Sequence, residues 1–255
     1  KIGHDPIKQR DWKGRRPFIG EKTRKMQARK KDIQQKQRRV IEQKSELLKD
    51  IEEMESLKLH PKQHFKKQLI CCRDLQIQYD DREIFMPLSF EIQQGDRVVL
   101  KGSNGCGKSS LIKLILGEAI DYKGTLERAS QLEISYVSQD TSMLKGTLRD
   151  YAQEKGIEES LLKSILRKLD FERETFDRNM ESFSQGQKKK VLIAASLCDQ
   201  AHLYLWDEPL NYIDIFSRMQ IEELLETFRP TMLFVEHDKT FADRIAAKAV
   251  PIVPL

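Results

Sequence analysis

Residues 102–109 read Gly102-Ser103-Asn104-Gly105-Cys106-Gly107-Lys108-Ser109, which matches the pattern G-x-x-x-x-G-K-[ST]. The stretch follows an apolar run at residues 97–101 and precedes a helix-forming segment, which is the context that a phosphate-binding loop requires. Glycines let backbone N–H groups close around phosphate oxygens, and the helix presents its positive N-terminal end. We therefore expect the loop, with Ser110 after it, to bind nucleotide phosphates. Lys108 would neutralise phosphate charge and Ser109 would offer its hydroxyl to Mg²⁺.

An apolar run at residues 203–208 ends in two acids, Asp207 and Glu208. A carboxylate at the C-terminal edge of a strand can hold Mg²⁺ through water beside a phosphate loop, and we assign this part to Asp207. Glu208 is then placed to orient or deprotonate the attacking water, which makes it the candidate general base. Because an acidic pair after a buried strand more often starts a loop, the assignment depends on the motifs that accompany it.

Strand-like patterns alternate with helical segments through the globular part of the chain, and this alternation predicts an α/β layer structure. The stretch from about 141 to 198 is mostly helix-forming, and we expect it to be a helical subdomain. The expected strands cover residues 69–79, 84–92, 97–101, 134–138, 202–206, 231–236 and 250–253.

Further motifs at the ends of these expected elements resemble the ABC ATPase family over residues 69–255, which implies the ABC-type P-loop NTPase fold. Gln139, in Tyr136-Val137-Ser138-Gln139-Asp140, resembles the Q-loop glutamine that touches Mg²⁺ and the attacking water in that family. His237 resembles the switch histidine that senses the γ-phosphate, although a lone histidine at a strand end is usually structural. Tyr79 lies where the family stacks an aromatic ring on adenine, and it could equally be a core tyrosine.

The segment Phe183-Ser184-Gln185-Gly186-Gln187 resembles the LSGGQ signature of the same family. The resemblance implies that Ser184, Gly186 and Gln187 meet ATP bound by an opposing domain, because ABC domains bind ATP in head-to-tail pairs. Phe183 replaces leucine, and Gln185 replaces a glycine, which puts a side chain where backbone would approach phosphate. Residues 210–214 resemble a D-loop. The expected partner is a second ABC domain in the same full-length protein, since this chain would not complete a nucleotide site by itself.

The N-terminal part differs in charge from the rest. Residues 1–68 hold 21 Lys+Arg and 10 Asp+Glu, a net charge of +11 in a chain of net charge +5. Such an excess is typical of contact with nucleic acid or anionic lipid, and a solvated helix face is the plainer alternative. We expect an irregular tip at residues 1–20, a basic helix at 21–60 and the ABC domain at 61–255. The helix carries an apolar residue every seventh position, at Met26, Ile33, Val40, Leu47 and Met54.

One narrow apolar stripe needs one partner helix, supplied either by a second copy or by sequence outside this chain. A charged helical hairpin between two cassettes is typical of ABC-F proteins, and residues 1–60 resemble the second half of that linker. Within the ABC-F family, the sequence resembles most the antibiotic-resistance members of the Vga/Lsa type. Three stretches carry this resemblance: Pro17-Phe18-Ile19-Gly20, residues 185–190 and residues 206–211. Repair ATPases with coiled coils insert them between phosphate loop and signature, whereas here the helix precedes the whole cassette.

The ABC-F resemblance implies ATP and Mg²⁺ as cofactors and the ribosome as partner, through 23S rRNA and the P-site tRNA. In the antibiotic-resistance members of that family, the linker tip enters the ribosome beside the peptidyl transferase centre and displaces lincosamides, pleuromutilins and streptogramin A. Basic side chains of the arm would neutralise RNA phosphates, and Trp12 and Phe18 would stack on bases or pack the tip. A housekeeping ABC-F translation factor and the ATPase subunit of a membrane transporter are the alternatives.

No uninterrupted apolar stretch approaches the roughly 20 residues that span a bilayer, so we expect no membrane contact. The four cysteines lack the spacing of metal ligands, and two of them are adjacent, which disfavours a structural disulfide. Reduced thiols fit a cytoplasmic protein best.

Overall fold

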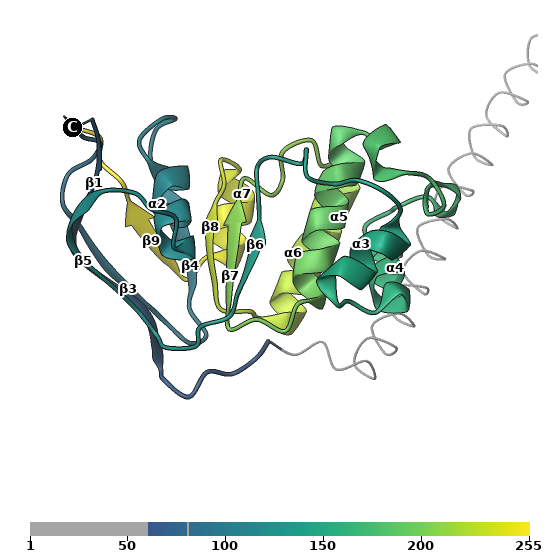
Figure 1. The fold of residues 1–255 in the computed structure, drawn as a ribbon, viewed down its shortest axis with the longest axis horizontal. Coiled ribbons are helices and arrows are strands. Elements are labelled where there is room, and N and C mark those ends of the chain that lie inside the picture. The colour runs from purple at the N-terminus through teal and green to yellow at the C-terminus, as the bar shows by residue number, and fades with distance from the viewer. Residues whose placement is uncertain (1–60, 81) are drawn as a thin grey trace, which may run out of the picture. The chain divides into compact units, whose positions relative to one another are not determined.

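A computed structural model describes residues 61–80 and 82–255. The expected linker tip at 1–20 and basic helix at 21–60 lie outside the described residues, so both stay predictions. The described part contains two sheets, with helices packed between and beside them (Figure 1). Within it, no helix combines the length and apolarity needed to cross a lipid bilayer.

The central sheet is parallel and has the strand order β6-β7-β8-β4-β9. Its strands read as short apolar runs because both faces are covered, as parallel sheets require. Val98 and Leu100 of one strand pack into one hydrophobic core, whereas Val99 between them packs into the other. The strands are β4 (Arg97–Lys101), β6 (Ile134–Val137), β7 (Leu203–Asp207), β8 (Met232–Val235) and β9 (Lys248–Pro251).

The second sheet is antiparallel, with the long strand β1 (Gln68–Tyr79) paired to all the others. These are β2 (Arg82–Glu83), β3 (Leu88–Gln93) and β5 (Tyr122–Arg128). All seven expected strands overlap an observed one, but the strand expected at 84–92 begins only at Leu88. Before it, Ile84 still donates its backbone N–H to the Ile77 carbonyl of β1 at 3.1 Å, and Phe85 forms an isolated bridge to Pro254.

Strand β5 has no counterpart among the expected strands. Its side chains are mostly exposed, so its sequence lacks the apolar alternation that indicates a half-buried strand. It also contains Gly124, where a Cβ would lie 2.3 Å from the Asp74 carbonyl oxygen, beside an irregularity in the pairing with β1. The neighbouring strand leaves no room for a side chain at this position, but in the sequence alone such a glycine indicates a turn.

Helix α2 (Lys108–Leu116) lies between the two sheets, and its apolar side chains join the core that both sheets share (Figure 1). The segment 141–198 is mainly helical and contains α3 (Leu148–Lys155), α4 (Glu159–Lys168) and α5 (Gln185–Cys198), with short 3₁₀ turns η1 (Arg173–Thr175) and η2 (Met180–Ser182). These helices, together with α6 (Ile215–Phe228) and α7 (Lys239–Ile245), contribute to the other core.

Helix α5 is fixed to the parallel sheet by polar as well as apolar contacts. Trp206 of β7 is fully buried, and its indole N–H donates to the Ser196 hydroxyl over 2.9 Å. Ser135 of β6 donates to the same hydroxyl, also over 2.9 Å. A buried indole needs such an acceptor, so the contact sets how α5 lies on the strands that end at the candidate site.

Candidate functional site

The loop between β4 and α2 is shaped by two of its glycines. Gly107 precedes α2 with a φ of 95°, and a Cβ there would lie 3.0 Å from the Phe85 ring. At Gly102, a Cβ would lie 2.5 Å from the Cys106 sulfur, which is buried under the loop. Lys108 donates to the carbonyls of Gly102 at 3.0 Å and Ser103 at 2.8 Å, so its ammonium lies against the loop.

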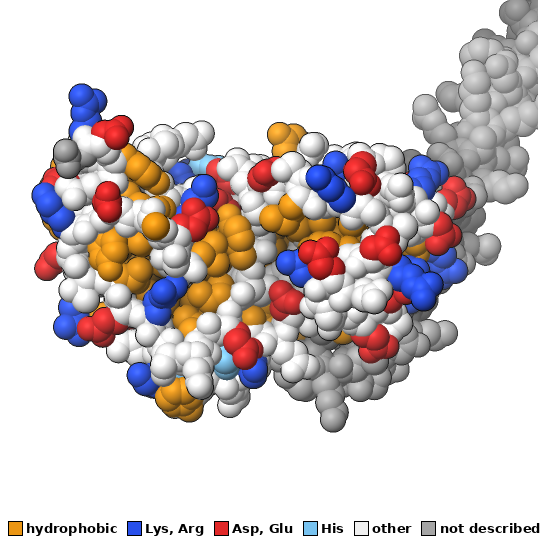
Figure 2. Space-filling model, viewed as in Figure 1, with side chains coloured by type: hydrophobic (Ala, Val, Ile, Leu, Met, Phe, Trp, Pro, Cys, Tyr) orange, Lys and Arg blue, Asp and Glu red, His pale blue; other side chains and the backbone are white. Residues whose placement is uncertain are grey.

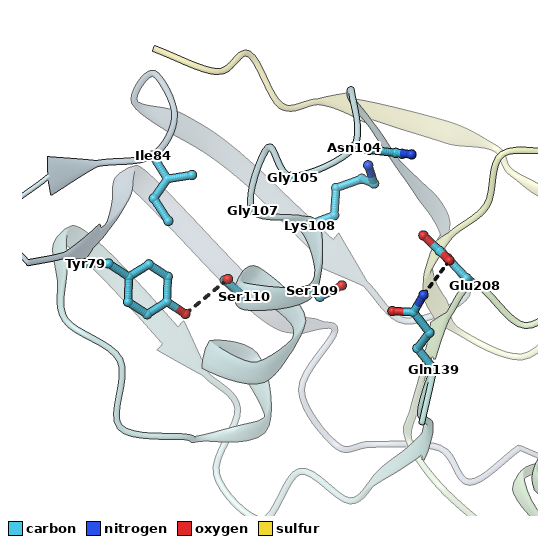
Figure 3. A pocket seen from close by; sticks show the side chains of 10 residues that line it. All are labelled: Tyr79, Ile84, Asn104, Gly105, Gly107, Lys108, Ser109, Ser110, Gln139 and Glu208. Atoms are coloured by element: carbon cyan, nitrogen blue, oxygen red, sulfur yellow. Dashed lines mark hydrogen bonds between the residues drawn. The ribbon is translucent and has the colours of Figure 1, made fainter. Parts of the chain in front are cut away.

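A pocket of about 520 Å³ lies over this loop (Figure 3). Tyr79 and Ile84 lie at one end, and Gln139 and Glu208 at the other. The Tyr79 side chain is 47% exposed and its hydroxyl donates to Ser110 at 3.1 Å, so it is not a core tyrosine. The pocket is lined by Tyr79, Ile84, Asn104, Gly105, Gly107, Lys108, Ser109, Ser110, Gln139 and Glu208.

Three side chains converge on the Glu208 carboxylate. The Gln139 amide donates to Oε2 at 2.9 Å, and the Asn211 amide donates to the same oxygen at 2.6 Å. His237 Nε2 lies 3.2 Å from Oε1. Glu208 itself has a φ of 47°, a left-handed conformation that costs about 1 kcal/mol or more for a residue with a side chain. The sheet end thus holds this carboxylate in one orientation, at the edge of the pocket.

Asp207 lies directly before it and is 2% exposed. Burial raises the pKa of this carboxyl and the Ser109 hydroxyl bond lowers it, while Glu208 raises it further. One carboxylate oxygen, Oδ1, has no hydrogen-bond partner among the described residues. Mg²⁺ at nucleotide sites is held by one or two protein oxygens together with phosphate and water. The Ser109 hydroxyl and the Asp207 carboxylate fit such an ion, and no cluster of three or more ligating side chains is found in the described part.

The signature residues lie elsewhere in the domain. Ser184 caps α5, with its hydroxyl accepting from the Gln187 N–H at 3.2 Å, and the Gln187 side chain accepts from the Ser184 N–H at 2.9 Å. At Gly186, a Cβ would lie 2.5 Å from the Tyr212 carbonyl oxygen. None of the three lines the pocket, so the chain does not bring its own signature to its own phosphate loop.

Gln185, which replaces the usual glycine, accepts a hydrogen bond at Oε1 from the Thr141 hydroxyl at 2.8 Å. Its side chain is therefore tied within its own domain, to the segment that follows Gln139.

Sequence reasoning missed three residues that organise the site. Asn211 belongs to the expected D-loop, and its position three residues after Glu208 could have indicated its contact with that carboxylate. Glu236 accepts from the backbone N–H groups of Leu210 and His237, at 3.2 and 2.7 Å. It therefore holds the D-loop and the histidine segment together.

The third missed residue is Lys189, which is 1% exposed. Its ammonium donates to the carbonyl oxygens of Ser138 at 2.8 Å and Asp207 at 3.3 Å. Burial lowers its pKa to about 8, against the opposing effect of Asp207, Glu208 and Glu236. In the sequence it stands inside three consecutive lysines, which resemble a solvated surface.

Comparisons with known proteins agree with this geometry. The profile of the family described as "ABC transporter" matches residues 85–211. The ATP-binding protein Uup of Caulobacter vibrioides is 30% identical over 195 residues, which is 73% of this chain and 32% of that protein. The ABC transporter F family member 2 of Arabidopsis thaliana is 26% identical over 192 residues, 73% of this chain and 28% of that protein. The chain thus spans about a third of the length of these curated relatives.

Solved structures share the fold. The ATP-binding subunit of an ABC transporter superposes with a TM-score of 0.63 at 23% identity, covering 72% of this chain and 86% of that one. A bacterial Atm1-family ABC exporter with ATP bound gives a TM-score of 0.62 at 20% identity, covering 72% of this chain and 36% of the exporter. The expected α/β P-loop fold is confirmed. The chain contains an ATP-binding domain of the ABC ATPase family, and its curated relatives are ABC-F proteins.

Proposed function

We propose that this domain binds ATP with Mg²⁺ and hydrolyses it with Glu208 as the general base. The observation that carries the proposal is the convergence of Gln139, Asn211 and His237 on the Glu208 carboxylate at the edge of the phosphate-loop pocket. A base held in one orientation and within reach of a phosphate site is what water activation needs.

The pocket supplies the remaining parts of the reaction. The Tyr79 ring provides a face for the adenine, while loop N–H groups and Lys108 hold the phosphates. Mg²⁺ bound at Ser109 and Asp207 would neutralise charge on the phosphate oxygens. Gln139 and Glu208 position a water in line with the γ-phosphate, and Glu208 accepts its proton. His237, bonded to Glu208, senses whether the γ-phosphate is present.

We further propose that a second ABC domain completes the nucleotide site. The signature residues Ser184, Gly186 and Gln187 lie outside the pocket, which leaves them free to meet a nucleotide bound elsewhere. Beside them, the D-loop and the start of α6 expose large apolar side chains, Tyr212 at 77% and Ile215 at 74%. Such neighbouring exposed apolar residues are typical of a protein interface.

For the biological role, we propose that the protein acts on the ribosome through its basic N-terminal residues. Residues 1–60 hold 18 Lys+Arg and 10 Asp+Glu. On the domain face in Figure 2, by contrast, acidic and basic side chains are interspersed. The relatives' membership of the ABC-F group supports a ribosomal partner. As the specific role we propose protection of the peptidyl transferase centre from lincosamides, pleuromutilins and streptogramin A, on the resemblance of residues 185–190 and 206–211 to the Vga/Lsa type.

The test is cosedimentation of the natural full-length polypeptide carrying Glu208→Gln with 70S ribosomes, with ATP or ADP. We expect association with ATP that weakens steeply as salt rises, because phosphate contacts release counterions. Equal sedimentation with ATP and ADP would contradict the ribosomal role. Displacement of a labelled lincosamide from the complex would support drug protection, and ATP-dependent binding without displacement would support a translation factor instead.

A further inference from the structure

Two side chains on one face of α5 hold the segment that carries Gln139. Gln185 and Lys189 are four residues apart, so they lie one helical turn apart on the same side. Gln185 is bonded to the Thr141 hydroxyl, and Lys189 to the Ser138 carbonyl. Both contacts reach residues 138–141, at the C-terminal end of β6.

Lys189 also reaches the neighbouring strand end. Its second acceptor is the Asp207 carbonyl, so one ammonium joins the ends of β6 and β7. The two bonded carbonyls belong to the peptide units that lead directly into Gln139 and Glu208. The side chains of these same two residues are hydrogen-bonded to each other at 2.9 Å (Figure 3).

We propose that Lys189 is a positioning residue for the proposed ATP hydrolysis, holding the backbone at Gln139 and Glu208 so that both side chains face the attacking water. This inference rests on the proposed function. Lys189 does not line the pocket, so it acts through the two strand ends and not through nucleotide contact.

The two hydrogen bonds of the Lys189 ammonium should matter for the positions of both strand ends. A buried ammonium is costly unless its donors are used, and here two of them meet carbonyls at strand ends. With a side chain of the same length but no donor, both carbonyls lose this partner and the strand ends are free to shift. A misplacement of about 1 Å can reduce turnover on the order of 100-fold while leaving substrate affinity nearly intact.

The hydrogen bonds of Lys189 also join α5 to the backbone that carries Gln139 and Glu208. The helix begins at the signature residue Ser184 and carries Lys189 in its second turn. A movement of the signature would therefore displace Lys189 and, through its two hydrogen bonds, the backbone at Gln139 and Glu208 of the same domain. Turnover, rather than nucleotide binding, is the quantity that should respond.

The experiment compares Lys189→Met, Lys189→Arg and the matched control Lys188→Met in the natural full-length polypeptide. Lys188 is the preceding residue of the same helix, is half-buried, and does not line the pocket. ATP turnover is measured at saturating ATP, and affinity with a fluorescent ATP analogue. We expect Lys189→Met to lower kcat about 10- to 100-fold with affinity changed less than about threefold. Lys189→Arg should restore at least part of kcat, and Lys188→Met should match the wild type.

The outcome that overturns the inference is wild-type kcat in Lys189→Met, or an equal loss in Lys188→Met. Should Lys189→Met fail to fold, Thr141→Val decides, because it removes only the bond to Gln185. A kcat lowered about two- to fivefold at unchanged affinity supports a positioning role for the face of α5 that carries Gln185 and Lys189, and an unchanged kcat counts against that role. Glu208→Gln separates the two proposals: if that variant turns over ATP normally, the proposed function fails, whatever Lys189 does.

Discussion

The pocket around Glu208 and the signature around Ser184 lie in the same domain but differ in how complete they are. At the pocket, side chains from several elements meet one carboxylate, and the phosphate loop already has its shape. At the signature, the hydrogen bonds of the Ser184 and Gln187 side chains within the described part of the chain go to their own helix end. This difference is what the proposed pairing with a second ABC domain requires, with the pocket as the half-site for chemistry and the signature as the half-site for recognition.

The largest effect is expected from Glu208→Gln, which keeps the shape of the side chain but removes the base. We expect ATP turnover in the natural full-length polypeptide to fall about 100- to 10,000-fold, while the ATP complex still forms. Steady-state phosphate release and retention of labelled ATP would measure the two quantities. Continued rapid turnover would contradict the assignment of Glu208 and remove the distinction between a chemical half-site and a recognition half-site.

Lys108→Ala tests whether the pocket half of this contrast binds the nucleotide. Its ammonium is the charged group of the phosphate loop, and losing a charge-assisted contact of about 2–3 kcal/mol corresponds to an affinity about 30- to 150-fold weaker. We expect this loss in residues 1–255 alone, measured by titration with a fluorescent ATP analogue. Undiminished binding would show that the pocket over the loop is not the nucleotide site.

Ser184→Ala should behave in the opposite way in the same binding assay. ATP affinity of residues 1–255 should stay within about twofold of the wild type, because Ser184 does not line the pocket. The variant loses the side-chain cap of α5, which lowers the free energy of unfolding by about 1 kcal/mol. Denaturant unfolding measures the stability, and a large drop in affinity would mean that signature and loop serve one nucleotide within one chain.

Much of this arrangement could be predicted from the sequence because it is encoded locally. The glycines and lysine at 102–109 fix the loop by their spacing, and an apolar run followed by two acids indicates a strand end. The contacts of Lys189 could not be predicted, because three consecutive lysines indicate a solvated surface. Its burial depends on how α5 packs against two strands that are distant in sequence.

The same reason explains the missed strand and the missed role of Glu236. Strand β5 is mostly exposed and follows the edge of β1, so its pairing is set by a neighbour and not by its own pattern. Glu236 acts through its carboxylate on backbone N–H groups of another loop. Backbone acceptors and donors leave no pattern in a sequence, whereas motif spacing does.

The smallest effect concerns the stability of the domain at acid pH, through Asp214 and its contact with Lys190 of the signature helix α5. Burial would raise the pKa of Asp214, but the Ser217 N–H and hydroxyl bonds and the Lys190 ammonium at 3.0 Å together lower it to about 2. Since the unfolded value is about 3.9, the unfolded chain binds more protons between these limits, and stability falls as pH drops from about 4 to about 2. The side chain is 47% exposed, so the ionic contribution is below about 1 kcal/mol.

Asp214→Asn tests this contribution, since it keeps a capping side chain but has no charge to lose. We expect the variant to unfold slightly more easily than the wild type at pH 7, and the gap to close as pH approaches about 2. Urea unfolding of residues 1–255 across this range measures it, with salt added to screen the contact with Lys190. A gap that persists at low pH would assign the stabilisation to the helix cap, and the ion pair between α5 and α6 would then contribute nothing to holding the signature helix.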